Sequence, residues 1–501
     1  MVVQHNMQAA NANRMLNVTT GQQAKSTEKL SSGYRINRAA DDAAGLTISE
    51  KMRKQIRGLD QASTNAQDGV SSVQTAEGAL TEVHSMLQRM NELATQAANG
   101  TNSKDSDRQA IQDEIDQLTT EIDRVSETTK FNETYLLKGE AGTKTINMKA
   151  HDAGLKGKLT DNGDGTATFV MDTLNAGDKV SIGGKSYTIG SDDAEVDKWF
   201  KDNATDVANS ANKKVTVNGT EYTYYAAKAP NTTAGSLTDG WNAGWYASAP
   251  TDKGDGTGTA LSGKFADVDA IKTEVKKGAT VQNGTKSVTG MNDTTPKDGV
   301  SDTDATVISK NKAYELASKE LLKANQIGDT EGKAKVGTSA NVDTAIDLTN
   351  GDGTFSIKVG QAKVANSLAF SLHVGADADM TNKIQVNIDA MDSASLGIKG
   401  LNVKDDSGNA ATYAVDAISD AISKVSSQRS SLGAVQNRLE HTINNLDNVV
   451  ENTTTAESRI RDTDMAEEMV NYSKNNILAQ AGQSMLAQAN QSNQGVLSLL
   501  Q

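Results

Sequence analysis

Histidines are the side chains best suited to metal binding and to proton transfer near neutral pH, and their spacing in this sequence predicts neither. They stand at His5, His84, His151, His373 and His441, and none belongs to an H-E-x-x-H motif. The chain also lacks a G-x-x-x-x-G-K-[ST] phosphate loop and a G-x-S-x-G nucleophile elbow. We therefore expect no catalytic residue, no metal site, no cofactor and no enzymatic activity.

Carboxylates offer the next candidate chemistry. The Asp and Glu residues of Asp105–Asp123 are predicted to lie opposite an Ile stripe, where charge keeps a helix face in water, and this interpretation is favoured over paired-carboxylate catalysis. A repeated Gly-Asp-Gly-Thr lacks the D-x-[DN]-x-[DN]-G spacing of a calcium loop, so tight turns are predicted instead. The repeats begin at Gly163, Gly254 and Gly351.

The composition limits the possible partners of the chain. Its 501 residues carry a net charge of −14, which argues against nucleic acid or an anionic membrane surface as a partner. Cysteine is absent, so disulfides and zinc–thiolate sites are excluded. The first 21 residues lack the basic and apolar regions of a secretory signal peptide, and no stretch is expected to insert into a membrane. If the protein is exported, another route must recognise it.

The stretch Asn475–Gln501 contains no Asp, Glu, Lys or Arg, although such residues make up 23% of the chain. A helix without a charged face is poorly suited to standing alone in water, so this segment is predicted to be buried against other helices. Residues 1–40 have a similar composition, and we expect the two ends of the chain to pair. The apolar residues of the tail recur at helical spacing: Leu478, Ala481, Met485, Ala489, Val496, Leu497, Leu499 and Leu500.

Three further stripes at steps of three and four predict long, coiled-coil-like helices. Two precede the middle of the chain and one follows it, so the two halves must return to each other. Asn99–Asp107, rich in Asn, Gly, Ser and Asp, should separate the first two helices. The stripes are Val73, Ala76, Leu80, Val83, Leu87, Met90, Ala94 and Ala97; Ile111, Ile115, Leu118, Ile122 and Val125; and Ile418, Ile422, Val425, Leu432, Leu439, Ile443, Leu446 and Val450.

The middle of the chain, about residues 159–368, is predicted to be mostly β, in one or two domains. Alternating residues around Asn218-Gly219 and around Gly183-Gly184 predict two hairpins. Asp192–Asn212 and Lys310–Gln326 are predicted to be short helices. For the three tryptophans, core packing is favoured over a ligand groove: Trp199, Trp241 and Trp245. The predicted fold class is mainly α with a β-rich insertion, the long helices from both chain ends forming a coiled-coil-like bundle.

Several long motifs resemble those of bacterial flagellins of the Firmicutes type. The resemblance covers residues 1–140 and 400–501, and the middle matches no family. At the amino-terminal end the motifs are Leu30–Asn37 (LSSGYRIN), Ala39–Leu46 (AADDAAGL), Gly58–Gly69 (GLDQASTNAQDG) and Thr75–Leu80 (TAEGAL). At the carboxy-terminal end they are Ser431–Leu439 (SLGAVQNRL), Glu457–Ala466 (ESRIRDTDMA) and Val496–Leu500 (VLSLL).

The resemblance implies a subunit of the extracellular flagellar filament, exported by the flagellar type III apparatus and polymerised with itself. It implies a flagellar export chaperone, a filament cap and hook–filament junction proteins as partners. It also implies a terminal coiled-coil domain (residues 1–45 and 461–501) that is disordered before assembly, a helical bundle domain with a small β element (46–160 and 369–460) and a variable outer region (161–368). Assembly and chaperone binding are expected at Leu478, Met485, Leu486, Val496, Leu497, Leu499 and Leu500.

Flagellins are also ligands of the flagellin-sensing Toll-like receptor of the host. The family's receptor motif, Q-R-x-x-E-L, corresponds here to Gln88, Arg89, Glu92 and Leu93, with Glu114 on the next helix. The resemblance implies that these residues bind the receptor. The alternative is that they are solvated residues that serve filament packing.

Two other functions compete with the filament subunit. A hook–filament junction protein shares the terminal helices, but the uninterrupted run Arg35–Gly45 and the Val-Leu-Ser-Leu-Leu ending favour the filament subunit. A filament subunit with a metalloprotease in its middle domain is disfavoured by the missing H-E-x-x-H motif.

Overall fold

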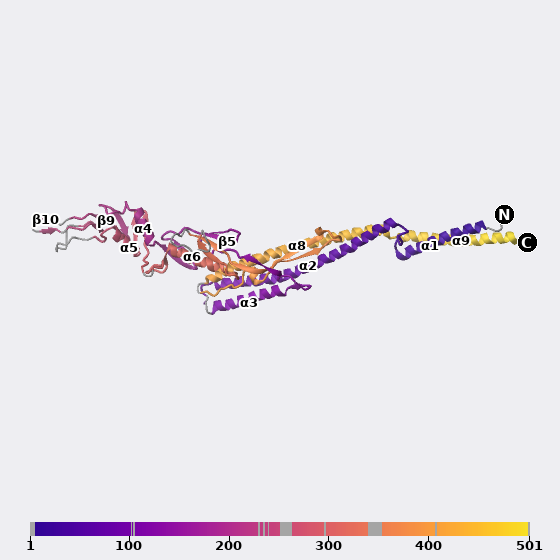
Figure 1. The fold of residues 1–501 in the computed structure, drawn as a ribbon, viewed down its shortest axis with the longest axis horizontal. Coiled ribbons are helices and arrows are strands. Elements are labelled where there is room, and N and C mark those ends of the chain that lie inside the picture. The colour runs from indigo at the N-terminus through magenta and orange to yellow at the C-terminus, as the bar shows by residue number, and fades with distance from the viewer. Residues whose placement is uncertain are drawn as a thin grey trace. The chain divides into compact units, whose positions relative to one another are not determined.

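The computed structural model describes residues 6–101, 103, 106–228, 231–233, 236–238, 240–250, 263–294, 297–338, 353–405 and 408–498. Its helices, labelled in Figure 1, are α1 (Met7–Ser32), α2 (Ala43–Ala97), α3 (Asp107–Thr128), α4 (Asp193–Asp202), α5 (Val268–Lys276), α6 (Lys310–Asn325), α7 (Ser393–Leu396), α8 (Asn409–Arg461) and α9 (Met465–Ser498), with a 3-10 turn η2 (Met380–Asn382). Among the described residues, none of the helices is long and apolar enough to cross a bilayer.

The strands lie between α3 and α8 in the chain, and helices α4 to α7 and the turn η2 lie among them. They are β1 (Lys130–Phe131), β2 (Thr134–Tyr135), β3 (Glu140–Asn147), β4 (Gly157–Asp161), β5 (Thr166–Met171), β6 (Lys179–Ile182), β7 (Lys185–Gly190), β8 (Lys214–Val217), β9 (Thr220–Tyr225), β10 (Asn231–Thr233), β11 (Ser236–Thr238), β12 (Gly244–Tyr246), β13 (Thr280–Asn283), β14 (Lys286–Thr289), β15 (Val307–Ser309), β16 (Lys335–Thr338), β17 (Thr354–Lys358), β18 (Gln361–Asn366), β19 (Leu368–His373) and β20 (Lys383–Ile388). Long helices from both chain ends and a β-rich middle confirm the predicted fold class.

The chain divides into two compact units. The first comprises Met1–Thr75, Ala369–Asn387 and Ser430–Gln501, and the second comprises Ala76–Leu368 and Ile388–Arg429. Because each unit combines segments from both ends of the chain, the predicted return of the two halves to each other is confirmed. The finer division into three domains, with boundaries near residues 45, 160, 368 and 461, stays a prediction.

In the first unit, the start of α2 packs against the end of α8, and the β19–β20 hairpin covers them. Leu59 of α2 clusters with Leu446 of α8, and the Ser63 hydroxyl donates a hydrogen bond to Asp447 Oδ1 at 3.1 Å. Gly69 lies inside α2 because the hairpin approaches there: a Cβ at this position would lie 2.2 Å from Leu372 Cδ1.

In the second unit, the predicted stripes are the cores of the helices. Every residue of the α2 stripe, from Val73 at the edge of the first unit to Ala97, is 0% exposed, and Ile111, Ile115 and Ile122 of α3 are buried. The period of three and four residues thus located the buried faces correctly. Arg108 then fixes the turn between α2 and α3, since its buried guanidinium donates hydrogen bonds to the carbonyl oxygens of Ala97 (2.9 Å) and Asp405 (2.8 Å).

Both predicted hairpins are present. β8 and β9 pair with Val217 opposite Thr220, and β6 and β7 pair with Ile182 opposite Lys185. Asn218 and Gly219 have φ of 47° and 77°, the positive values that a two-residue type I′ turn requires. The first Gly-Asp-Gly-Thr is a tight turn between β4 and β5, as predicted, with Asp161 Oδ1 accepting from the Gly163 N–H. The repeats at Gly254 and Gly351 lie outside the described residues.

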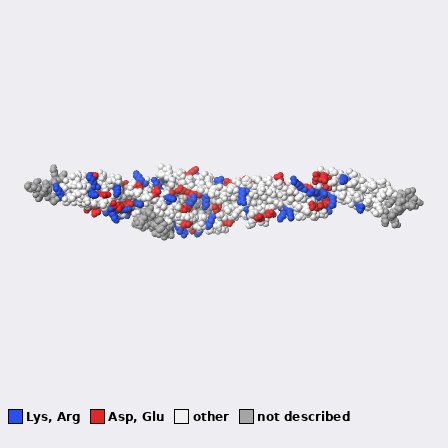
Figure 2. Space-filling view, turned by 90° about the horizontal axis from the view of Figure 1, so that it is seen from above, with Lys and Arg blue, Asp and Glu red and all other residues white. Residues whose placement is uncertain are grey.

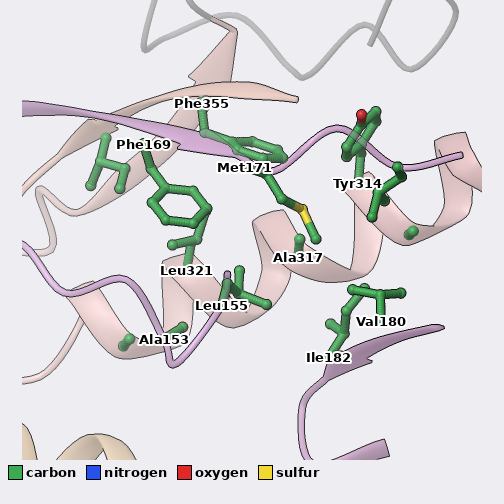
Figure 3. Close-up of a cluster of buried hydrophobic side chains, with 14 of the residues drawn as sticks. Ala153, Leu155, Phe169, Met171, Val180, Ile182, Tyr314, Ala317, Leu321 and Phe355 are labelled. Atoms are coloured by element: carbon green, nitrogen blue, oxygen red, sulfur yellow. The ribbon is translucent and has the colours of Figure 1, made fainter. Parts of the chain in front are cut away.

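The β-rich middle has two separate apolar cores. In one, shown in Figure 3, β5 and β17 contribute Phe169 and Phe355, whose ring centroids are 6.2 Å apart, and α6 contributes Tyr314 and Leu321. In the other, α4 and α5 pack on the five-stranded sheet β12-β9-β8-β13-β14 around the fully buried Trp245.

One of the two short helices predicted in the middle is wrong in length. The helix expected over Asp192–Asn212 ends at Asp202, where the Asn203 side chain donates a hydrogen bond to the Trp199 carbonyl at 2.8 Å. An Asn side chain that bonds the backbone in this way competes with the continuing helix. The other helix, α6, matches its predicted range to within one residue.

Two breaks in the helices of the first unit, between α1 and α2 and between α8 and α9, are bonded to each other. α1 ends at Gly33, whose φ of 74° is the left-handed conformation common after a helix. The Arg35 N–H donates to the Arg461 carbonyl at 2.7 Å, and the Thr463 N–H donates to the Gly33 carbonyl at 3.0 Å. These bonds join positions more than 400 residues apart in the sequence.

Side chains reinforce this junction, and we call them the Tyr34 clasp: Tyr34, Glu50, Arg53, Glu457 and Arg461. The Tyr34 ring contacts the guanidinium carbons of Arg53 and Arg461, which lie 5.6 and 4.9 Å from its centroid. Arg461 is also paired with Glu50 at 2.7 Å, and Arg53 with Glu457 at 3.4 Å. The clasp therefore has two cations, two anions and one aromatic ring.

Replacing Tyr34 with Leu should loosen the junction. The change removes two cation–π contacts, each contributing about 0.5–1 kcal/mol. We expect the amides of Arg35 and Thr463 to exchange with solvent roughly 5- to 30-fold faster, measured by hydrogen exchange on the intact chain. Tyr135→Leu is the matched control because Tyr135 is 44% exposed and contacts a single cation, that of Lys138. Equal exchange rates in wild type and Tyr34→Leu would contradict a role for the clasp.

Candidate functional site

The two terminal helices, α1 and α9, form an antiparallel pair. Asn6 caps α1 by accepting from the Ala9 N–H, and its amide donates to the Ala489 carbonyl at 3.2 Å. Toward the other end of α1, the Lys29 ammonium lies 3.9 Å from a Glu468 carboxylate oxygen. The predicted pairing of the chain ends is therefore confirmed.

This pair buries few of its own side chains. Among the described side chains of α1 and α9, only Ser26 and Ala479 are buried. On the face drawn in Figure 2, charged residues gather near one end of the pair and the remainder is largely white. Large apolar residues lie in water instead: Met7 (74% exposed), Met15 (58%), Val18 (51%), Ile477 (67%), Leu478 (47%) and Met485 (61%).

A groove of about 760 Å³ runs between the two helices and has no charged residue in its lining. Gly482 of α9 lies beside Leu16 of α1 in this groove, where a Cβ would make an ordinary van der Waals contact with Leu16 Cδ1 at 3.4 Å. The groove can accept apolar side chains of a further helix without burying an unpaired charge, which would be costly. Its apolar lining residues are Ala12, Met15, Leu16, Leu478, Ala481, Met485 and Ala489.

The predicted assembly residues differ in their exposure. Leu478 and Met485 are exposed and line the groove, and Leu486 is half-buried. Val496 and Leu497 belong to α9, but their side chains lie outside the described part of the chain, as do Leu499 and Leu500. Three further exposed apolar residues of the same helix were not predicted from the sequence: Met469, Val470 and Ile477.

The five residues predicted to bind a receptor lie on α2 and α3 of the second unit. Arg89 Nε donates to Glu114 Oε1 at 2.9 Å across the two helices, and Arg89 Nη1 donates to Glu92 Oε2 at 3.2 Å. The hydrogen bond that Arg89 donates to Glu114, followed by the one it donates to Glu92, raises the pKa of Arg89. Gln88 is exposed beside them. Leu93 faces the other way, is 2% exposed and packs in the bundle core.

We name the exposed set Gln88, Arg89, Glu92 and Glu114 the Arg89 surface. Its charged groups are 45–69% exposed at the side chain, so its ion pairs add little to stability. The same exposure leaves both signs of charge open to a partner. A planar guanidinium beside two carboxylates can give charge-assisted hydrogen bonds in an interface.

Residues considered for catalysis or metal binding have structural partners instead. Asp123 accepts hydrogen bonds from the backbone and hydroxyl of Ser393, and His84 Nε2 lies 3.1 Å from the Gln88 amide. Trp245 packs edge-on against Tyr224 in a core. Within the described ranges, no group of three His, Asp or Glu residues is placed to hold a metal ion.

Comparisons with known proteins identify the family to which the chain belongs. Two family models match: the bacterial flagellin N-terminal helical region over residues 3–142 and the bacterial flagellin C-terminal helical region over residues 415–500. A flagellin of Clostridium tyrobutyricum is 37% identical, covering 99% of this chain and 100% of the relative. A flagellin of Bacillus subtilis (strain 168) is 33% identical, covering 100% of both.

Among solved structures, that of FliC from Burkholderia pseudomallei covers 74% of this chain and 99% of its own, with 18% identity and a TM-score of 0.25. The full-length identity to curated flagellins and the two matching family models assign the chain without reference to that structure. The chain belongs to the bacterial flagellin family.

Proposed function

We propose that this chain is the structural subunit of a flagellar filament and that the α1–α9 pair is buried between subunits on assembly. The observation that carries the proposal is the row of exposed apolar residues along a helix pair whose groove has no charged residue in its lining. Burying one Leu or Met side chain contributes about 1.5–3 kcal/mol. Several such residues in each subunit supply a strong drive to associate.

The geometry of such a polymer follows from the asymmetry of the subunit. When one surface of a subunit binds a different surface of the next, the contact does not close, and it generates a helical filament. An apolar groove on one copy and an apolar helix face on another provide the two surfaces. The named curated relatives are flagellins, which favours this function over the hook–filament junction protein.

Export and chaperoning complete this proposal. The filament lies outside the cell, and the resemblance implies export through the flagellar type III apparatus. Until assembly, the apolar side chains of α9 would stay in water, so a flagellar export chaperone is expected to cover them. The chaperone site proposed is the set of assembly residues, of which Leu478 and Met485 are exposed in the single chain.

The Arg89 surface is proposed to bind the flagellin-sensing Toll-like receptor of the host. Its support is an exposed guanidinium and two exposed carboxylates placed on neighbouring helices, an arrangement suited to charge-assisted contacts. Leu93, the last residue of the motif, would act through the bundle core in which it packs. Arginine is among the residues that most often dominate interface energies.

Adding a charge to the assembly face should block polymerisation. Met485→Glu places a carboxylate where an apolar contact is expected, so the concentration needed for filament growth should rise at least about tenfold. Deleting Asn475–Gln501 should abolish filaments and leave a soluble, folded remainder. Sedimentation and negative-stain electron microscopy measure both outcomes.

Val170→Glu is the control for that experiment, since Val170 is an exposed apolar residue (43%) of a β-strand in the outer region. It should polymerise normally. Normal filaments from the truncated chain would disprove the assembly role of the tail.

The receptor proposal is tested by the paired change Arg89→Ala with Glu114→Ala. We expect at least about a tenfold loss of affinity for the receptor ectodomain, measured by surface plasmon resonance, with the helical circular dichroism unchanged. Glu121→Ala with Arg124→Ala is a close control, because this pair is also exposed and ion-paired on α3. If both double variants bind as tightly as wild type, the Arg89 surface is not the receptor site.

A further inference from the structure

A pocket in the second unit belongs to neither the assembly residues nor the Arg89 surface. Its volume is about 350 Å³, within the range usual for small-molecule sites. Its walls come from the end of β3 and the residues after it, from α7 and from one face of α8. The α8 residues recur at steps of three and four, which places them on one side of the helix: Ala417, Asp420, Ser423, Lys424 and Ser427.

Lys424 is a cation without a matching anion in this pocket. Its ammonium donates one hydrogen bond, to the Ser395 carbonyl at 2.6 Å, and an ammonium has three donors. Among the described residues, no carboxylate lies within ion-pair distance of it. Burial lowers the pKa of Lys424, and the carboxylates of Asp389 and Asp392, which lie beyond ion-pair distance, offset that lowering only in part.

The other charges of the pocket compensate one another. Asp420 Oδ1 lies 2.8 Å from the Lys149 ammonium, and Asp420 Oδ2 lies 3.8 Å from His151 Nε2. Lys424 is therefore the net positive charge of the lining. Ser423 and Ser427 present exposed hydroxyls on the same face of α8, and the buried Ser395 hydroxyl has no hydrogen-bond partner.

A second part of the lining is apolar. It comprises Ile146, Met148, Ile327 and Leu396, together with Ala417 of α8. At Gly397 the lining has little room for a side chain, since a Cβ there would lie 2.9 Å from Met148 Sδ. A ligand that suits both parts of the lining must carry one negatively charged hydrogen-bond acceptor on a short hydrocarbon chain.

We propose that this pocket binds a small aliphatic carboxylate, with its oxygens at Lys424 and the α8 hydroxyls and its hydrocarbon on Ile146, Met148 and Leu396. A phosphate dianion fits less well, because it carries two negative charges and the lining supplies one net positive charge.

The test is binding of hexanoate to the full-length chain, measured by calorimetry and by ligand-observed NMR at up to about 20 mM. Hexanamide tests the charge, acetate tests the hydrocarbon and inorganic phosphate tests selectivity among anions. We expect hexanoate to bind and each of the other three to bind at least about tenfold more weakly. No binding of hexanoate, or equal binding of any of the three, overturns the proposal.

Variants locate the site. Lys424→Met keeps the length of the side chain and should weaken hexanoate binding at least about tenfold. Lys158→Met, which removes an exposed lysine of β4 outside the pocket, should leave affinity within about twofold. Ser427→Phe fills the pocket from an exposed helix position, so it should abolish binding while the chain stays folded. Undiminished binding in Lys424→Met or in Ser427→Phe refutes the assignment.

Discussion

The contact between the Tyr34 ring and two guanidinium groups holds the ends of this chain in register. Arg53 comes from α2 and Arg461 from the last turn of α8, so neither local segment can form the contact alone. The α1–α9 pair beyond it buries few of its own side chains, and helices in proteins take most of their stability from the packing of a buried face. The junction therefore fixes where the pair begins, although it adds little apolar surface of its own.

The groove of the terminal pair has no charged residue in its lining, and the weak internal packing of the pair gives the physical reason. A pair that completed its own core would be stable in isolation and would have little left to bury against a neighbour. Met15, Leu478 and Met485 have exposed side chains. The free energy of burying them is therefore gained only when another subunit covers them. A single carboxylate at the same place would oppose that step by more than one Leu contributes.

Periodic features were predictable from the sequence, and isolated pairings were not. The α2 stripe was located residue by residue because burial on a helix repeats every three or four positions. The Asn218-Gly219 turn was predictable because a type I′ turn needs positive φ at both central residues, and few residue types adopt it. The early end of α4 depends on one side chain, that of Asn203, bonding backward to the helix. The Tyr34 clasp joins residues about 400 positions apart, and no local pattern announces it.

The candidate sites were likewise predictable where a local sequence pattern describes them and not where distant segments meet. The motif around Arg89 pointed to an exposed ion pair that the structure contains, but it could not tell that Leu93 turns into the core. That distinction needs the position of α3, which decides which side of α2 is covered. The Lys424 pocket could not be predicted from the sequence for a related reason. Lys424 lies on a helix face, whereas most of the apolar lining comes from distant residues near 146 and 396.

Within the second unit, α8 connects the helices to the β-rich middle through a few buried polar contacts. Tyr413 packs in the core around Phe355, and its hydroxyl donates to Glu320 of α6 at 2.8 Å. Burial, followed by that bond to Glu320, raises the pKa of Tyr413, so the hydroxyl remains a donor over the whole physiological range. This tyrosine therefore ties the core around Phe355 to the start of α8.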